Sequence, residues 1–185
     1  MEEKALKKYF TSGSMGSSLF GIGCSVVAIL WLVLRSSLNI LSDRIYFLEV
    51  IGLLMGPIMI VTSLKTIRKA RKLMSILRRN NAIGYVYNSF SKTNENLSYA
   101  DNSVIISDYY LFLKEPVMVV TYPEITRVYM KYTRNNKNEV TSSQLLCSTT
   151  SKEDITVFSS IKNQDELMHF LGAIRQKNPY VQIEF

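Results

Sequence analysis

Hydrophobic residues follow two patterns along this chain, long uninterrupted runs near its start and short alternating runs after them. Thr11–Leu34 contains 24 residues without a charge, and Ile45–Leu64 contains 20 residues with a single charge, Glu49. At about 1.5 Å of rise per residue, either run can cross a hydrocarbon layer of roughly 30 Å as a helix. A buried helix of a soluble protein is the alternative for one such run, but a chain of 185 residues is too short to cover two in tandem. The pattern predicts transmembrane helices at residues 17–35 and 45–64.

The charges that flank these runs predict the topology. Only residues 36–44 separate the two helices, so an antiparallel hairpin with a short outer loop is expected. Two basic residues, Arg35 and Arg44, border this loop, whereas three lysines precede the first run and seven basic residues follow the second. The positive-inside rule then predicts a multi-pass protein of the cell membrane with both termini in the cytoplasm. The N-terminal cytoplasmic segment would be residues 1–16. A cleaved signal peptide is the alternative for the first run, but no small-x-small cleavage site follows Arg35.

A basic stretch follows the second run. Within Ser63–Asn80 there are seven basic residues and no acid, namely Lys65, Arg68, Lys69, Arg71, Lys72, Arg78 and Arg79. Apolar residues recur between them at helical spacing, which predicts a basic amphipathic stalk helix over residues 65–81. Its cations are expected to contact the anionic membrane surface, and the alternative is a solvated stalk whose charges only set the topology. Nucleic acid is not an expected partner, because no aromatic residues lie between the cations and the chain after Ala82 has ten basic against eleven acidic residues.

Small residues recur four positions apart inside both apolar runs. They are Ser17, Gly21 and Ser25 in the first run and Gly52 and Gly56 in the second. Such spacing lets helix backbones approach closely in lipid, so we expect the two helices to pack on each other, with a homo-oligomer formed through these faces as the alternative.

Glu49 is near the outer end of its run, where it can reach water or Arg44. The alternative is a buried functional carboxylate in a transporter subunit.

Short β-like runs separated by Asn, Ser, Asp and Lys occupy the chain after Ala82. The candidate strands are Ile83–Phe90, Leu97–Tyr99, Ser103–Ile106, Tyr109–Leu113, Val117–Tyr122, Ile125–Thr133, Ser142–Ser148 and Ile155–Ser159. So many short strands predict a meander that curls into a barrel or a sandwich.

A single helix is expected after these strands. Asn163 can cap it, and Glu166 can reach back to the amide of that cap. An apolar stripe follows at helical spacing, formed by Leu167, Phe170, Leu171 and Ile174. Asn178-Pro179 should end this helix, which would then close the open end of the barrel.

Three segments of residues 82–185 are similar to bacterial pleckstrin-homology-like (PH-like, GRAM-like) domains. They are "ISDYYLFL", "VVTYPEITRVY" and the closing helix "NQDELMHFLGAIRQKNPYV". The resemblance implies a two-helix transmembrane hairpin plus a mainly β PH-like barrel closed by one C-terminal α-helix. It also implies a platform rather than a catalytic activity. The basic residues with which family members bind lipid do not carry over, since Lys92 stands almost alone near the first strand pair.

Residues with catalytic potential are few in this sequence. The one histidine, His169, is predicted to point away from the apolar stripe of the last helix, and Cys147 falls in a strand without a histidine nearby. No glycine-rich phosphate loop, H-E-x-x-H or C-x-x-C is present, and Cys24 lies far away in the first apolar run. We therefore predict no catalytic, cofactor-binding or metal-binding residues, and expect a protein that is not an enzyme.

Three functions are compatible with this pattern. The first is a membrane-tethered cytoplasmic binding or scaffold module for an unknown protein partner, with exposed Tyr109, Tyr129 or Tyr132 as anchors. The second is a binder of anionic lipid headgroups, in which Arg127 and Lys131 act together with the basic stretch. The third is an accessory subunit of a membrane transporter.

Overall fold

The first long apolar run forms α2 (Ser14–Leu38). The computed structural model describes residues 2–38, 43–92, 96–151, 154–159 and 163–184, apart from the side chains of residues 15, 35–38 and 43–52. Within α2, Gly16–Leu34 has a mean hydropathy of 2.2, and among the described residues it is the one segment long and apolar enough to cross a membrane. Its large side chains lie on the surface, with Leu19 and Val27 being 71% and 66% exposed. This surface is compatible with membrane association.

The second apolar run and the basic stretch belong to one helix. α3 (Asp43–Arg79) has 37 residues and contains Pro57. It is helical across the whole span predicted at residues 45–64, but the side chains of Glu49 and Gly52 lie outside the described ones. The prediction of a second transmembrane span therefore remains a prediction.

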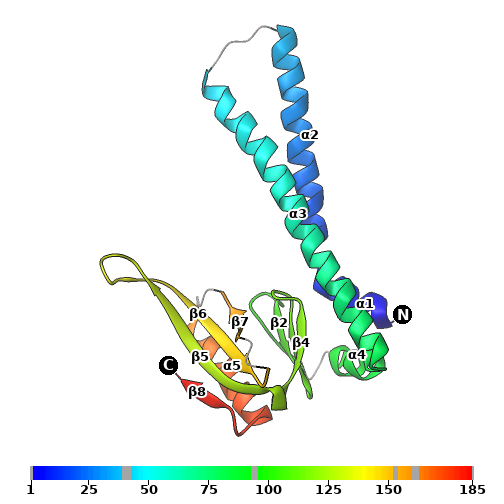
Figure 1. Ribbon diagram of the computed structural model, residues 1–185, viewed down its shortest axis with the longest axis vertical. Helices are drawn as coiled ribbons and strands as arrows, with labels where there is room; N and C mark the ends of the chain where they lie inside the picture. Colours follow the sequence, from blue (N-terminus) through cyan, green and yellow to red (C-terminus); the bar gives the residue numbers. More distant parts are fainter. Residues whose placement is uncertain (1, 39–42, 93–95, 152–153, 160–162, 185) are drawn as a thin grey trace. The chain divides into compact units, whose positions relative to one another are not determined.

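The chain divides into two units (Figure 1). The helical unit is Lys7–Lys72, and the β unit joins Met1–Leu6 to Leu73–Phe185. α1 (Glu2–Thr11) and α3 contribute to both units. Within the β unit, Arg78 at the end of α3 forms an ion pair with Glu3 of α1.

A left-handed residue ends α3. Asn81 has a φ of 51°, and the amide of Ala82 donates to the carbonyl of Leu77 at 2.9 Å while the amide of Asn81 donates to that of Arg78 at 3.1 Å. These two bonds form a Schellman turn, in which asparagine is one of the few residues that adopt a positive φ at low cost.

The segment predicted as the first strand, Ile83–Phe90, is instead a helix, α4 (Ile83–Ser91). Its valine and tyrosines favour a strand locally, but packing decides its conformation. Val86 and Ser89 are buried three positions apart, as on one helix face. Phe90 meets Phe112, in a strand farther along the chain, edge-to-face at 5.4 Å between ring centroids. The strand prediction was wrong because this face covers a sheet rather than joining one.

Two four-stranded sheets form the rest of the β unit. The first has the order β1-β2-β3-β4 and is antiparallel throughout. Its strands are β1 (Leu97–Tyr99), β2 (Val104–Ile106), β3 (Tyr110–Leu113) and β4 (Met118–Thr121). The second has the order β7-β6-β5-β8, in which only β8 is parallel to its neighbour. Its strands are β5 (Ile125–Arg134), β6 (Val140–Thr149), β7 (Asp154–Phe158) and β8 (Gln182–Glu184).

The two sheets do not close into a barrel, so the predicted barrel was wrong. The chain passes from β4 to β5 through a 3-10 turn, Tyr122–Glu124, instead of pairing these strands. Pro123 in this turn has no amide hydrogen to donate to a ladder. A capping box between Thr121 and Glu124 fixes the turn, with the amide of Thr121 donating to the Glu124 carboxylate at 3.1 Å. The chain therefore changes sheets at this point.

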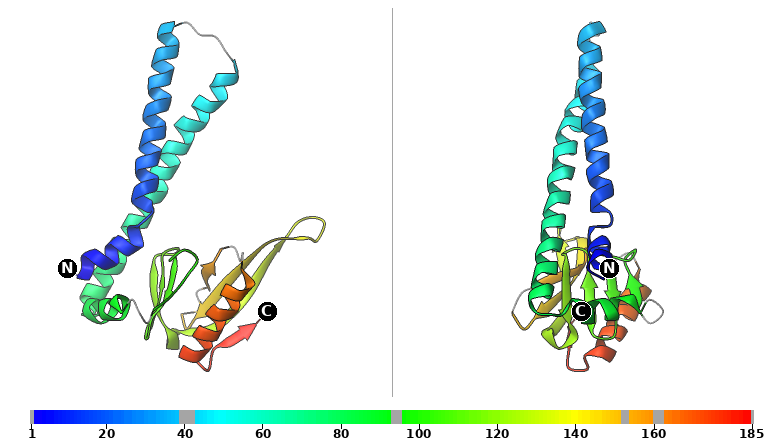
Figure 2. Two further views of the ribbon diagram at one scale, coloured as in Figure 1. Left: turned by 180° about the vertical axis from the view of Figure 1, so that it is seen from behind. Right: turned by 90° about the vertical axis from the view of Figure 1, so that its right-hand side faces the viewer.

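The core lies between the sheets and beneath α5 (Gln164–Lys177). Figure 2 shows α5 against the face of the second sheet that is turned away in Figure 1. All four residues of the predicted stripe are buried, and Phe170 and Ile174 are fully so. They pack with residues from both sheets, among them Val104, Leu111 and Leu145. α5 thus covers the open side of the two sheets.

The predicted ends of α5 are partly confirmed. The side-chain oxygen of Asn163 accepts from the amides of Asp165 at 3.0 Å and Glu166 at 3.5 Å, as a cap does. The predicted bond from Glu166 back to the cap is wrong, because its carboxylate instead accepts from the amide of Ala100 at 2.6 Å. At the other end, α5 stops at Lys177 with Asn178 as its C-cap.

Candidate functional site

A hollow between α4 and the first sheet is the strongest candidate for a binding site. It has a volume of about 640 Å³. We call it the tyrosine groove, and its lining residues are Tyr85, Asn88, Ser89, Lys92, Asp108, Tyr109, Tyr110, Thr121 and Pro123. Tyr85 and Tyr109 are 75% and 70% exposed. Two exposed aromatic rings beside a hollow offer a large contact area at a small cost in side-chain entropy.

Buried hydrogen bonds fix the walls of the tyrosine groove. The hydroxyls of Ser89 in α4 and Ser107 in the β2–β3 turn are 2.7 Å apart and buried. The Tyr122 hydroxyl donates to the carbonyls of Ser107 at 2.5 Å and Tyr110 at 3.0 Å. The groups in these bonds are buried or half-buried, so losing the network as a whole would leave polar groups unsatisfied. These bonds therefore hold α4, the β2–β3 turn and Tyr122 together at the groove.

One carboxylate joins three elements at the edge of this groove. Asp108 accepts from Lys92, which follows α4, at 3.4 Å and from Lys177 at the end of α5 at 3.1 Å. Its hydrogen bond and charge interaction with Lys177, with smaller contributions from Lys92, hold the pKa of Asp108 below its ordinary value. The carboxylate is thus ionised near neutral pH and holds α4 and α5 to the same turn.

The three tyrosines predicted as anchors have different surroundings. Tyr109 lies in the tyrosine groove, and Tyr132 is 48% exposed on β5. Tyr129 is half-buried, and its hydroxyl donates to the Asp154 carboxylate at 2.8 Å. That bond raises the pKa of Tyr129 and keeps its ring on the outer face of the second sheet.

Tyr85 was not predicted as a site residue, because a strand was predicted there. The helical spacing of Val86 and Phe90 was the signal that could have indicated it.

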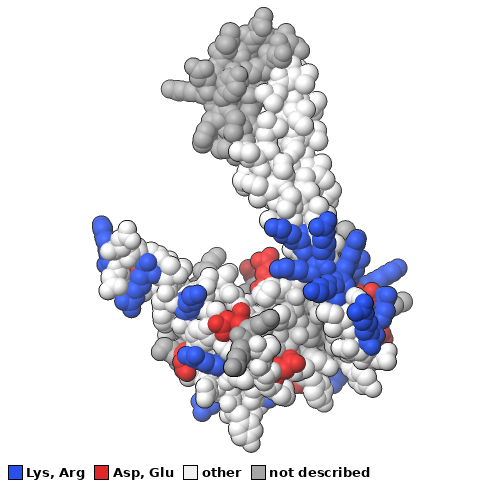
Figure 3. All heavy atoms as spheres, viewed as in Figure 1, with Lys and Arg blue, Asp and Glu red and all other residues white. Residues whose placement is uncertain are grey.

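The two cations proposed for lipid headgroups also differ. Arg127 forms an ion pair with Glu184 of β8, and its guanidinium lies over the Tyr129 ring, 4.7 Å from the centroid. Lys131 is exposed. Figure 3 shows Lys and Arg side chains gathered at the outer end of the β5–β6 hairpin, where Lys131 is followed by Arg134 and Lys137. The available positive charge is therefore farther along the hairpin than Arg127.

All seven cations of the basic stretch are exposed on α3. They are Lys65, Arg68, Lys69, Arg71, Lys72, Arg78 and Arg79. The predicted apolar stripe is also present, but Ala70 and Met74 are 0% and 2% exposed. Because protein already covers these two residues, they are not free to enter lipid, and the exposed cations are the stronger candidates for contact with a membrane surface.

Glycines bring α2 and α3 together within the helical unit. A Cβ on Gly21 would lie 2.9 Å from the carbonyl oxygen of Gly56, and a Cβ on Gly56 would lie 1.9 Å from the hydroxyl oxygen of Ser25. Ser17 donates to the carbonyl of Gly13 at 2.9 Å in its own segment. Gly21 and Ser25 of α2 therefore lie in close contact with Gly56 of α3 in the same chain.

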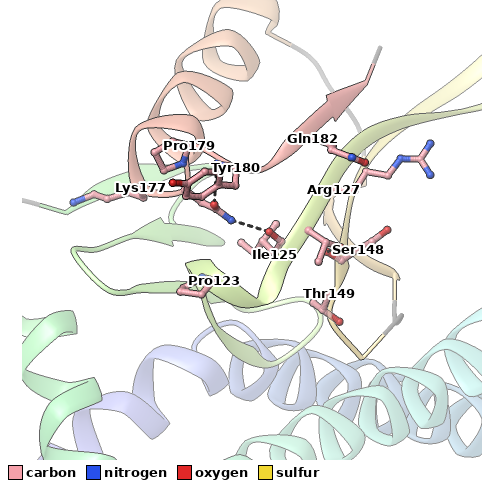
Figure 4. A pocket seen from close by; sticks show the side chains of 11 residues that line it. Pro123, Ile125, Arg127, Ser148, Thr149, Lys177, Pro179, Tyr180 and Gln182 are labelled. Atoms are coloured by element: carbon pink, nitrogen blue, oxygen red, sulfur yellow. Dashed lines mark hydrogen bonds between the residues drawn. The ribbon is translucent and has the colours of Figure 1, made fainter.

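A second hollow, of about 900 Å³, lies where α5 and β8 meet the start of β5. Figure 4 shows Tyr180 and Ile125 near its centre, while the side chains of Lys177 and Arg127 extend away from it in opposite directions. The amide of the Asn178 side chain donates to the carbonyls of Tyr122 at 2.9 Å and Ile125 at 2.8 Å. This hollow is a structural junction without charged groups aimed into it.

The described residues include no group of three or more His, Cys, Asp or Glu that could hold a metal ion. His169 is exposed, and its Nδ1 is 2.8 Å from the Tyr99 hydroxyl. Cys147 is buried, and burial raises its pKa to about 12. Its thiol therefore stays protonated and is a poor nucleophile.

In comparisons with known proteins, this chain matches no family model and no curated protein.

Proposed function

We propose that this protein is a membrane-tethered binding module whose tyrosine groove holds a segment of a protein partner. The observation that carries the proposal is the pair of exposed rings, Tyr85 and Tyr109, beside a hollow of about 640 Å³. Tyrosine is enriched among the residues that dominate the energetics of protein interfaces. The buried Ser89–Ser107 bond and the Asp108 ion pairs support a rigid site, which lowers the entropy cost of binding.

The tether in this proposal is a multi-pass anchor formed by α2 and the first part of α3, with both termini in the cytoplasm. The apolar surface of Gly16–Leu34 and the seven exposed cations of α3 support it. The order of two mainly antiparallel sheets followed by α5 supports the resemblance to PH-like domains, in which the β unit serves as a platform.

Site-specific photo-crosslinking in native membranes tests the binding site. A benzoylphenylalanine introduced at Tyr85 or at Tyr109 should give one discrete crosslinked product. The matched control is the same probe at Met168, which is 57% exposed on α5 and away from the groove. An Ala at Tyr109 should strongly reduce crosslinking from position 85. Equal products at Met168, or none at either tyrosine, would overturn the proposed site.

Reporter fusions test the anchor. A reporter that is active only in the cytoplasm should be active at both the amino and the carboxyl terminus of the full chain. Activity at one end alone would mean that one of the two predicted spans does not cross the membrane.

A further inference from the structure

The outer part of the β5–β6 hairpin lies beyond the core. We call residues 131–142 the hairpin arm, and every one of them is exposed. Closer to the core on the same two strands, Val128 and Leu145 are fully buried. A two-stranded ribbon without a buried face contributes little stability by itself. The arm is therefore not explained by packing of the β unit.

The end of the hairpin arm is nevertheless held in one conformation. The Asn135 side-chain oxygen accepts from the amides of Lys137 at 2.9 Å and Glu139 at 3.0 Å. Asn138 has a φ of 63°, and its side chain accepts from the Arg134 guanidinium at 3.1 Å. Asparagine tolerates this left-handed conformation better than most residues. These bonds restrict the conformations of the turn, which lowers the entropy cost of binding through it.

The charges of the hairpin arm have one dominant sign. It carries Lys131, Arg134 and Lys137 against a single acid, Glu139, in a chain that after Ala82 has ten basic and eleven acidic residues. The Glu139 carboxylate accepts from the Asn135 side chain at 2.8 Å. Within the chain after Ala82, positive charge is thus concentrated on the arm, whereas the residues outside the arm carry seven basic against ten acidic side chains.

Two exposed apolar side chains accompany these cations. Tyr132 is 48% exposed and Val140 is 54% exposed. Arg134 is paired with Val140 across the two strands, so these two side chains lie on one face, and Tyr132 stands two residues before Arg134, on the other side of an irregularity in the strand register. Tyrosine with nearby basic residues is typical of segments at the boundary between water and lipid headgroups.

We propose that the hairpin arm docks on an anionic bilayer surface, with its cations at the lipid phosphates and Tyr132 and Val140 in the headgroup layer. This goes beyond the proposed function, because the arm and the tyrosine groove share no residue. Charge complementarity and the membrane-compatible helix of the same chain favour lipid over nucleic acid. The excess of acidic over basic residues outside the arm in the chain after Ala82 also disfavours extended contact with a nucleic acid.

Tryptophan fluorescence of the full chain in lipid nanodiscs tests this docking. Trp31, the only tryptophan, is first replaced by Phe, and Tyr132→Trp then places one reporter on the arm. Tyr180→Trp on the same background is the matched control, because Tyr180 is 93% exposed on another part of the β unit. The nanodiscs contain brominated phosphatidylcholine, which quenches tryptophan, with or without added phosphatidylglycerol.

Docking predicts that phosphatidylglycerol increases quenching and shifts the emission to the blue for Tyr132→Trp and not for Tyr180→Trp. Replacing Lys131, Arg134 and Lys137 by Gln should lower the ratio of docked to free arm by about fivefold per cation. Added salt should also lower this ratio, because it screens the charges. The proposal is overturned if phosphatidylglycerol has no effect, if the control responds equally, or if the Gln variant behaves like the parent. It is also overturned if a duplex oligonucleotide changes the fluorescence where the anionic bilayer does not.

Discussion

Replacing Phe112 by Ala should release α4 from the first sheet. Phe112 is 0% exposed, on the face of β3 opposite to the main core, and its ring meets Phe90 of α4 at 5.4 Å and Tyr110 at 6.1 Å. Truncating a buried Phe costs about 3–5 kcal/mol, of which the aromatic pairs contribute roughly 0.5–1.5 kcal/mol each. If about 3 kcal/mol of this falls on the docking of α4, the opening equilibrium of α4 rises by a factor of about 150.

Hydrogen exchange of the full chain in nanodiscs measures this opening. Amides of α4 should exchange faster by about that factor, while amides of β6, which pack in the main core, should change less. Phe112→Leu is the matched control, because it keeps most of the apolar volume and should cost about 1.5 kcal/mol or less. The reasoning is refuted if α4 exchange in Phe112→Ala equals that of the parent, since α4 would then be held by other contacts.

Three further changes have defined outcomes. Gly56→Ala places a methyl group 1.9 Å from a serine hydroxyl of α2 and should lower the thermal stability of the detergent-solubilised chain, whereas Gly23→Ala, with nothing within 4 Å, should not. Because its pKa is about 12, Cys147 should resist maleimide at pH 8 and react only after denaturation; fast labelling of the folded chain would contradict its burial. Asp108 has a lowered pKa, so its stabilising effect is complete above its ordinary pKa of about 4 and is lost as the pH falls through the lower folded value. Asp108→Asn should therefore show a smaller loss of stability on acidification than the parent, measured by unfolding across pH.

Strand positions between residues 97 and 159 could be predicted to within a residue or two, because turn chemistry marks their ends, whereas β8 (Gln182–Glu184) was not predicted as a strand. Asn135–Glu139 and the Tyr122-Pro123 turn are local signals of this kind. The number and order of strands in each sheet depend on pairing between distant segments, which no local pattern specifies. For that reason the predicted barrel was wrong, and the parallel pairing of β8 with β5 was not anticipated.

The candidate site was harder to predict than the core. Tyr109 could be proposed as an anchor from composition alone, but the tyrosine groove exists only because α4 is a helix. Val86, Ser89 and Phe90 have the spacing of a helix face, yet the residues between them favour strands, so the two signals conflict. Contact with Phe112, far along the chain, decides between them.

The two ends of α5 are fastened to different parts of the β unit. Near its start, Glu166 accepts from Ala100 beside β1, and just past its end Asn178 donates to the carbonyls at the crossing between the sheets. A helix clamped in this way cannot peel off one sheet while staying on the other. Protease cleavage within α5 and the core strands should consequently occur in a single all-or-none step, and a shortened fragment that stops before Asn178 should lose both sheets rather than one.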